Sequence, residues 1–67
     1  MLTLRKERQR RGWSLIDLCG KTGISPSALS EIERELHVCY PGWRRRIALA
    51  FGKPEAELFA EADDDTR

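Results

Sequence analysis

Two stretches of helical length in this sequence are separated by only three residues, Thr22–Ile24. The first stretch opens at Ser14 and the second at Ser25-Pro26, where a serine N-cap precedes a proline in the first helical position. Between them, Gly23 can adopt the positive φ that ends one helix and turns the chain. Two helices joined by a turn of this length, with a glycine in it, are typical of a helix-turn-helix. The sequence therefore predicts this motif at about residues 14–35.

Glycine and proline divide the rest of the chain into three more short helices. The first is expected over Thr3–Arg11 and ends at Gly12, a residue that suits the position just after a helix. Another is expected over Gly42–Phe51, and a fifth, shorter helix begins at Pro54. No run of residues alternates apolar and polar types for long enough to predict a strand. The expected fold class is therefore all-α.

Charge is distributed unevenly along the 67 residues, although the net charge is only +1. Residues 1–53 hold eleven Lys or Arg and five Asp or Glu, whereas residues 54–67 hold one Arg and six acidic residues. A basic surface attracts phosphate and releases counterions when it binds. The alternative is that these charged residues are only solvated and bind no partner. A chain of this length holds one domain, which we expect over residues 1–60, followed by an acidic, disordered tail over residues 61–67.

Several classes of protein are disfavoured by features that the sequence lacks. No basic and apolar leader follows Met1, and the longest apolar run, Ile47–Phe51, is far shorter than a membrane span. We therefore expect a cytoplasmic protein with reduced thiols and no membrane contact. Cys19, His37 and Cys39 supply only three ligands without the spacing of a zinc site, so no metal is expected. With one histidine and no nucleophile in a catalytic setting, we expect neither an enzyme nor a cofactor.

The stretch GWSLIDLCGKTGISPSALSEIER, residues 12–34, resembles the phage-repressor, Cro and Xre family of helix-turn-helix regulators. The resemblance extends over about residues 4–60 and includes the later segments IALAFG and PEAELF. It implies a compact five-helix, lambda-repressor-like bundle that binds operator DNA, often as a dimer. In this family the first helix of the motif, here Ser14–Thr22, lies across the phosphate backbone. The second, here Ser25–Arg34, is the recognition helix that enters the major groove.

Matching the motif residue by residue gives the expected contacts with bases. The residues expected to face base edges are Ser25, Ser27, Ala28, Ser30 and Glu31. Serine, alanine and glutamate can each contact bases, but none makes the bidentate contacts of Arg with guanine or Gln with adenine. Direct readout is therefore expected to be weak, with selectivity coming from DNA shape or bridging water. The alternative is that these residues form only a solvated helix face.

Phosphate contacts are expected from helix N-termini and from nearby cations. The residues expected to make them are Ser14, Lys21, Arg34, Arg44 and Arg45. Arg46 completes a run of three arginines, of which a helix can point only one or two in the same direction. The alternative is that this run of arginines only keeps the protein soluble.

Other positions have structural roles in the resemblance. Arg8 and Glu33 occupy the positions of an ion pair between the first helix and the recognition helix. Glu35 stands where the family usually has glycine, so a different backbone conformation is expected at this exit. Glu7 stands where leucine is common, which is expected to weaken the apolar face of the first helix. Leu15 replaces a glutamine that can touch DNA, so it is expected to pack instead.

The expected function is that of a sequence-selective DNA-binding transcriptional regulator, a repressor and a homodimer, whose partner is double-stranded DNA. The alternative is a protein-interaction module on the same fold, such as an antitoxin or adaptor, in which this surface meets a protein partner. The weak base-reading set and the acidic Glu31 favour the alternative, whereas the basic body favours DNA. Trp43 is expected to cover the edge of the core or, if exposed beside Tyr40 and Phe59, to mark a self-association surface.

Overall fold

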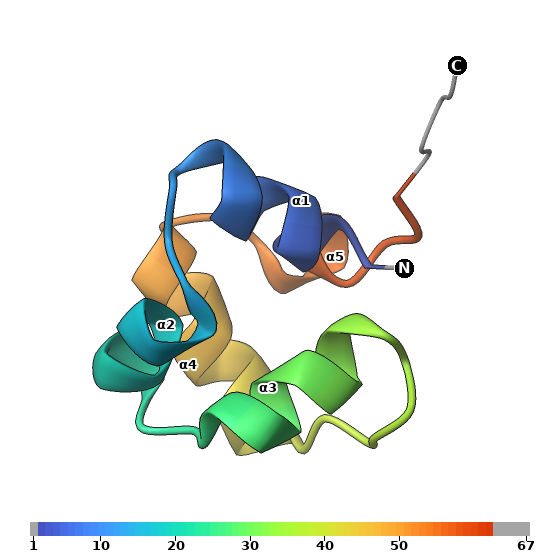
Figure 1. The fold of residues 1–67 in the computed structure, drawn as a ribbon. Coiled ribbons are helices and arrows are strands. Elements are labelled where there is room, and N and C mark those ends of the chain that lie inside the picture. The colour runs from blue at the N-terminus through green and yellow to red at the C-terminus, as the bar shows by residue number, and fades with distance from the viewer. Residues whose placement is uncertain (1, 63–67) are drawn as a thin grey trace.

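Five helices make up residues 2–62, the part of the chain that this computed structural model describes (Figure 1). They are α1 (Thr3–Arg10), α2 (Leu15–Thr22), α3 (Pro26–Glu33), α4 (Pro41–Phe51) and α5 (Glu55–Leu58). Within these residues the only β-type pairing is an isolated antiparallel bridge between Leu2 and Glu61. The predicted all-α, five-helix fold is therefore confirmed. Over the same residues, no helix has the length and apolar character needed to cross a bilayer.

The end of α1 shows why glycine stands at position 12. Gly12 has a φ of +72°, and its amide donates to the Gln9 carbonyl at 3.0 Å while the Trp13 amide donates to the Arg8 carbonyl at 3.0 Å. This pair of bonds satisfies the last carbonyls of the helix and needs a left-handed residue between them. The helix therefore ends where the sequence predicts, and the chain turns to start α2.

The turn between α2 and α3 is closed by hydroxyl groups at both of its ends. Thr22 Oγ1 donates to the Leu18 carbonyl at 2.8 Å and accepts from the Ile24 amide at 3.2 Å. Gly23, with a φ of +76°, makes the turn itself. Ser25 Oγ then accepts from an amide in the first turn of α3 at 3.2 Å, as its predicted N-cap role requires.

The end of α3 uses a glutamate in the left-handed conformation. Glu35 has a φ of +62° and is the only residue other than glycine with a positive φ among those described. Its amide donates to the Ile32 carbonyl at 3.0 Å, and the Leu36 amide donates to the Glu31 carbonyl at 2.8 Å, as at the end of α1. The expectation of a different exit was therefore wrong. The chain keeps the geometry of a glycine exit because these two bonds close the helix, and the Cβ of Glu35 is strained as a result.

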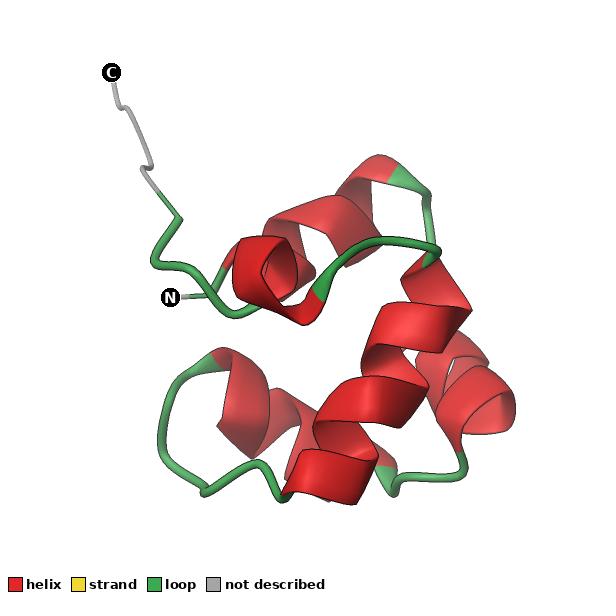
Figure 2. Cartoon of the chain, turned by 180° about the vertical axis from the view of Figure 1, so that it is seen from behind, coloured by secondary structure: helices red, strands yellow, loops and turns green. Residues whose placement is uncertain are grey.

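All five helices or their flanking residues contribute to one core. Its buried apolar members are Leu2, Leu4, Leu18, Ile24, Leu29, Ile32, Ile47, Phe51 and Leu58. Helix α2 packs against α3 and α4, and α5 packs against α1 and α4. Figures 1 and 2 show α1 and α5 side by side above α3, so one side of α3 is left uncovered by other helices.

The two ends of the described chain are tied together. The amide and hydroxyl groups of Thr3 both donate to the Ala60 carbonyl, at 2.9 and 3.0 Å. The Leu2 amide donates to the Glu33 carbonyl at 3.2 Å, which joins the end of α3 to the same place. Glu61, the first residue of the predicted tail, pairs with Leu2. Residues 63–67 of that tail lie outside the described residues.

Candidate nucleic-acid interface

The outer face of α3 is open to solvent. Its residues, exposed or half-buried, are Ser27, Ser30, Glu31 and Arg34. Together with Leu15 and Pro26 they line a shallow groove of about 350 Å³ between α3 and the start of α2. The opposite side of the helix carries Leu29 and Ile32, which are buried in the core. The structure therefore brings four of the predicted DNA-contacting residues together on one surface, with Leu15 packed beside them.

Two other residues predicted to face bases are already engaged within the fold. Ala28 is half-buried and packs against the core, which gives it a packing role that the sequence prediction did not include. Ser25 is exposed, but its oxygen accepts from the Ala28 amide as the helix cap. The hydroxyl hydrogen and one lone pair of Ser25 are left for external partners.

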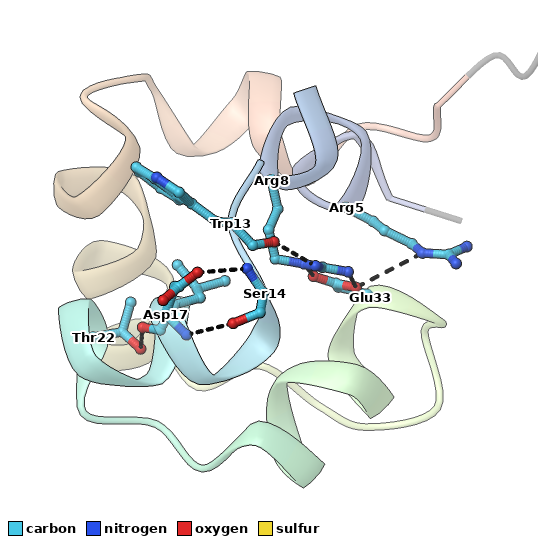
Figure 3. A network of polar contacts seen from close by, with 8 residues as sticks. Arg5, Arg8, Trp13, Ser14, Asp17, Thr22 and Glu33 are labelled. Carbon is cyan, nitrogen blue, oxygen red and sulfur yellow. Dashed lines mark hydrogen bonds and ion pairs between the residues drawn. The ribbon is translucent and has the colours of Figure 1, made fainter. Parts of the chain in front are cut away.

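Helix α3 is held in position by a buried ion pair with α1 (Figure 3). Arg8 Nε donates to Glu33 Oε2 at 2.7 Å, and Arg8 Nη2 donates to Glu33 Oε1 at 3.1 Å. Arg8 Nη1 also donates to the Trp13 carbonyl at 2.8 Å, and Arg5 Nε lies 3.9 Å from Glu33 Oε1. Arg8 and Glu33 are both buried, so this is the structural ion pair that the resemblance implies. It fixes the last turn of α3 relative to α1 and the start of the motif.

Glu7 is a second buried carboxylate on α1. Its Oε2 accepts from Arg10 Nη2 and, at 3.0 Å, from Arg11 Nε. The hydrogen bond from Arg10 lowers the pKa of Glu7, although burial opposes this shift. Arg11 Nη2 donates in turn to the Phe51 carbonyl at 2.8 Å, which links α1 to the end of α4. In place of an apolar contact, Glu7 therefore makes a bridge that leucine could not make.

The start of α2 carries its own carboxylate. Ser14 Oγ accepts from the Asp17 amide at 3.0 Å, and Asp17 Oδ2 accepts from the Ser14 amide at 2.9 Å (Figure 3). The predicted capping box is therefore complete. The bond from the Ser14 amide lowers the pKa of Asp17, so this carboxylate is ionised at neutral pH. The Ser14 amide is therefore not available to a phosphate, which could be bound only by the Ser14 hydroxyl group or by the amide of Leu15. The negative charge of Asp17 would repel a phosphate at this position.

Lys21 lies away from the groove of α3. Its Nζ is 4.6 Å from the ring centroid of Trp13, which is the geometry of a cation–π contact. With 3.6 residues per helical turn, Lys21 and the groove residue Leu15 lie about 120° apart around α2. The Arg11 guanidinium contacts the same ring, 5.1 Å from its centroid. Lys21 therefore belongs to a basic cluster around Trp13 rather than to the groove.

The consecutive arginines of α4 point in different directions. Arg44 Nε donates to Glu55 Oε1 at 3.3 Å, and its guanidinium carbon lies 4.3 Å from the centroid of the Phe59 ring. Arg46 is exposed, and its Nη1 lies 3.7 Å from the point that a Cβ on Gly23 would occupy. Arg44 therefore faces α5, whereas Arg46 lies beside the turn that leads into α3. This difference could not be predicted from the sequence, because it depends on how α4 packs on its neighbours.

The first turn of α4 is suited to an anion. The helix begins at Pro41 without a side-chain cap and has no acidic residue in its first turn. Its first amides have no acceptor within the helix, and the helix dipole gives this end a partial positive charge. Arg45, which is exposed, and Arg46 add two full charges nearby.

The residues weighed as metal ligands do not form a cluster. Over the described part of the chain, no group of three or more His, Cys, Asp or Glu side chains could hold a metal ion. Cys19 and Cys39 are free and half-buried. Burial raises the pKa of the Cys39 thiol, which keeps it protonated at neutral pH. The Cys39 thiol is therefore a poor nucleophile at neutral pH.

Comparison with known proteins gives one match. A family model described as a helix-turn-helix domain matches residues 2–60, which include all five helices. No curated protein and no solved structure gives a significant match. The matched region contains the motif, the groove of α3 and the Arg8–Glu33 ion pair. The chain therefore belongs to the helix-turn-helix domain family, which agrees with its resemblance to the phage-repressor, Cro and Xre regulators.

Proposed function

We propose that this protein is a sequence-selective DNA-binding transcriptional regulator that inserts α3 into the major groove of double-stranded DNA. The observation that carries the proposal is the outer face of α3, where Ser27, Glu31 and Arg34 are exposed on a helix whose other face is anchored in the core. An α-helix with its side chains is about 10–12 Å in diameter. The major groove is about 12 Å wide and admits an α-helix.

Base recognition in this proposal depends on short polar side chains. Ser27 and Ser30 can donate to bases or accept from them, and Glu31 can accept from the amino group of cytosine. Such contacts discriminate less than bidentate ones, so DNA shape and bridging water supply part of the selectivity. Arg34, at the end of α3, contacts a DNA phosphate that flanks the major groove.

Phosphate contacts in this proposal come mainly from the start of α4. The first-turn amides of α4, together with Arg45 and Arg46, bind the DNA phosphate backbone next to the major groove. The hydroxyl group of Ser14 adds a contact at the start of α2. Arg44 and Lys21 were expected to contribute. We leave them out because their side chains contact α5 and a tryptophan ring instead.

A single copy of α3 reads only a few base pairs. We therefore propose that a homodimer binds two half-sites about one helical turn, ~34 Å, apart. A dimer bound in this way covers its operator, and we propose that it represses transcription by keeping polymerase from the covered DNA.

Selection from random duplex DNA, followed by binding measurements over a salt series, tests the proposal. We expect a recoverable, roughly palindromic motif and a steep fall in affinity as salt rises. Ser27→Ala and Ser30→Ala should relax the selected sequence, and Arg45→Gln should weaken binding to all sequences alike. Gln9→Ala, an exposed substitution on α1, is the control and should change neither property.

Failure to enrich any motif, together with unchanged binding in the Ser27, Ser30 and Arg45 variants, contradicts the proposal. A protein-interaction module, such as an antitoxin or adaptor, is then favoured. The observation behind this second candidate is the groove itself, which combines apolar Leu15 with exposed Glu31. That chemistry also fits a basic segment of a protein partner.

A further inference from the structure

The groove beside α3 has an apolar wall. Leu15 and Pro26 line the groove together with the polar side chains of α3, and both residues are half-buried. Part of the Leu15 side chain packs against the core, and the rest faces the groove. We call Leu15 and Pro26 the apolar wall. The groove therefore offers apolar contact and hydrogen bonds side by side to a ligand that enters it.

Each residue of the apolar wall is the first residue of a capped helix. Leu15 begins α2 after Ser14, whose Oγ accepts from the Asp17 amide at 3.0 Å (Figure 3). Pro26 begins α3 after the cap Ser25, and its ring fixes its own φ. The apolar wall is therefore held in place before a ligand binds, which lowers the entropy cost of a contact there.

The next residue of α2, Ile16, does not share the orientation of Leu15. Ile16 is 73% exposed and does not line the groove. Successive residues turn by about 100° around a helix, so Ile16 points away from the side that Leu15 presents to α3. The two side chains contain the same number of carbon atoms and differ in what they face. They therefore form a matched pair for experiments.

The charge of the groove indicates which part of DNA meets the apolar wall. Glu31 lines the same groove and is exposed. Its carboxylate repels a phosphate, and the side chains of the apolar wall have no donor for one. The groove is therefore suited to the edge of a base rather than to the DNA backbone. In the major groove, the apolar group that a base edge presents is the C5-methyl group of thymine.

We propose that the apolar wall binds the C5-methyl group of a thymine, and that Leu15 is the residue that selects for it. This inference rests on the proposed function and specifies what the α3 groove reads. Ser27 follows Pro26 and lines the same groove, so its hydroxyl group can donate to O4 of that thymine, the acceptor next to the methyl group. Cytosine presents an amino group there and has no methyl group. Each half-site of the operator therefore requires thymine at one position.

Replacement of thymine by deoxyuridine in the selected operator tests the inference. Each thymine is replaced in turn, which removes the methyl group and keeps the base pair, and affinity is measured by fluorescence anisotropy. We expect one position in a half-site at which the replacement weakens wild-type binding about fourfold, the effect of losing one buried methyl-sized group. Leu15→Ala should bind the thymine and deoxyuridine duplexes with equal affinity at that position.

Ile16→Ala is the matched control, because it truncates an aliphatic side chain that lies outside the groove. It should keep the fourfold preference for thymine. The preference is a ratio of two affinities of the same protein. Partial unfolding of a variant lowers both affinities alike and leaves their ratio unchanged. Leu15→Ala therefore remains informative even if it is less stable than the wild type.

Three results overturn the inference. The first is a selected motif in which no replacement of thymine by deoxyuridine weakens wild-type binding. The second is a Leu15→Ala variant that keeps the wild-type preference for thymine. The third is an Ile16→Ala variant that loses this preference to the same extent as Leu15→Ala.

The same measurements separate this inference from the proposed function. A protein that enriches a DNA motif but binds the thymine and deoxyuridine duplexes equally refutes this inference alone. A protein that enriches no motif from random duplex DNA refutes the proposed function, and this inference with it.

Discussion

Glu35, which follows α3, adopts a conformation that side chains other than glycine avoid. In the left-handed region its Cβ approaches the following carbonyl, at a cost of about 1–2 kcal/mol. The conformation persists because the amides of Glu35 and Leu36 both close the last turn of α3.

Substituting glycine for Glu35 should therefore stabilise the fold relative to alanine. Both Glu35→Gly and Glu35→Ala remove the contacts of the carboxylate, but only alanine keeps the strained Cβ. We expect Glu35→Gly to be more stable than Glu35→Ala by about 1 kcal/mol, measured by urea unfolding at neutral pH. Equal stability of the two variants would show that position 35 carries no strain.

Helix α1 has charged residues on its inward face. Glu7 and Arg8 are buried there together with Leu4. Arg8 joins α1 to α3 through Glu33, and Glu7 joins Arg10 and Arg11, the second of which reaches α4. Because removing one partner leaves a buried charge, the packing of α1 depends on every pair being complete.

The stability contributed by Glu7 should depend on pH. Its pKa is lowered in the folded state, chiefly by the Arg10 hydrogen bond, from an ordinary value of 4.5. The stabilisation is therefore fully present above pH 4.5 and is lost as pH falls towards the lower pKa of the folded state. We expect the free energy of unfolding to fall less between neutral pH and pH 3 in Glu7→Gln than in the wild type.

Urea titrations at several pH values measure this difference. Glu31→Gln is the control, because it removes one exposed carboxylate from α3. Its unfolding free energy should follow the wild-type curve over the acidic range. If Glu7→Gln also runs parallel to the wild type, the bridge from Glu7 does not stabilise the fold.

Helix boundaries could be predicted from the sequence because caps act within a few residues. The capping box of Ser14 and Asp17 is complete within one helical turn, and so is the cap that Ser25 makes before its proline. Both caps lie where the sequence predicts them. The exit at Glu35 and the bridge at Glu7 could not be predicted in the same way. Each depends on which backbone and side-chain groups the packed helices bring near it.

At the candidate site, too, local features could be predicted from the sequence, but features that depend on helix packing could not. The outward face of α3 follows from helical periodicity, because Leu29 and Ile32 fix the inward side. Which arginine of α4 lies beside the motif depends instead on the rotation of α4 against α2 and α5. Sequence alone therefore identified the run of arginines and selected Arg44 and Arg45 from it, although Arg44 faces α5.

The basic side chains of the protein are divided between internal ion pairs and the open surface. Arg8, Arg10 and Arg11 are paired with carboxylates within the fold. The number of Lys and Arg residues in a segment therefore overstates the positive charge that it offers to DNA. The salt dependence of binding depends on the cations that reach phosphate, not on the total number of cations.

Neighbouring arginines on α4 should accordingly differ in their effect on DNA binding. Arg46 lies beside the turn into α3, so Arg46→Gln should weaken binding to the selected operator and reduce the slope of log affinity against log salt by about 0.9. Arg44→Gln removes the same charge two residues away, but its guanidinium is held by Glu55 and Phe59, so the slope should stay at the wild-type value. Fluorescence anisotropy over a salt series measures both slopes. Equal loss in the two variants would mean that overall charge, and not the placement of Arg46 at the motif, governs the interaction.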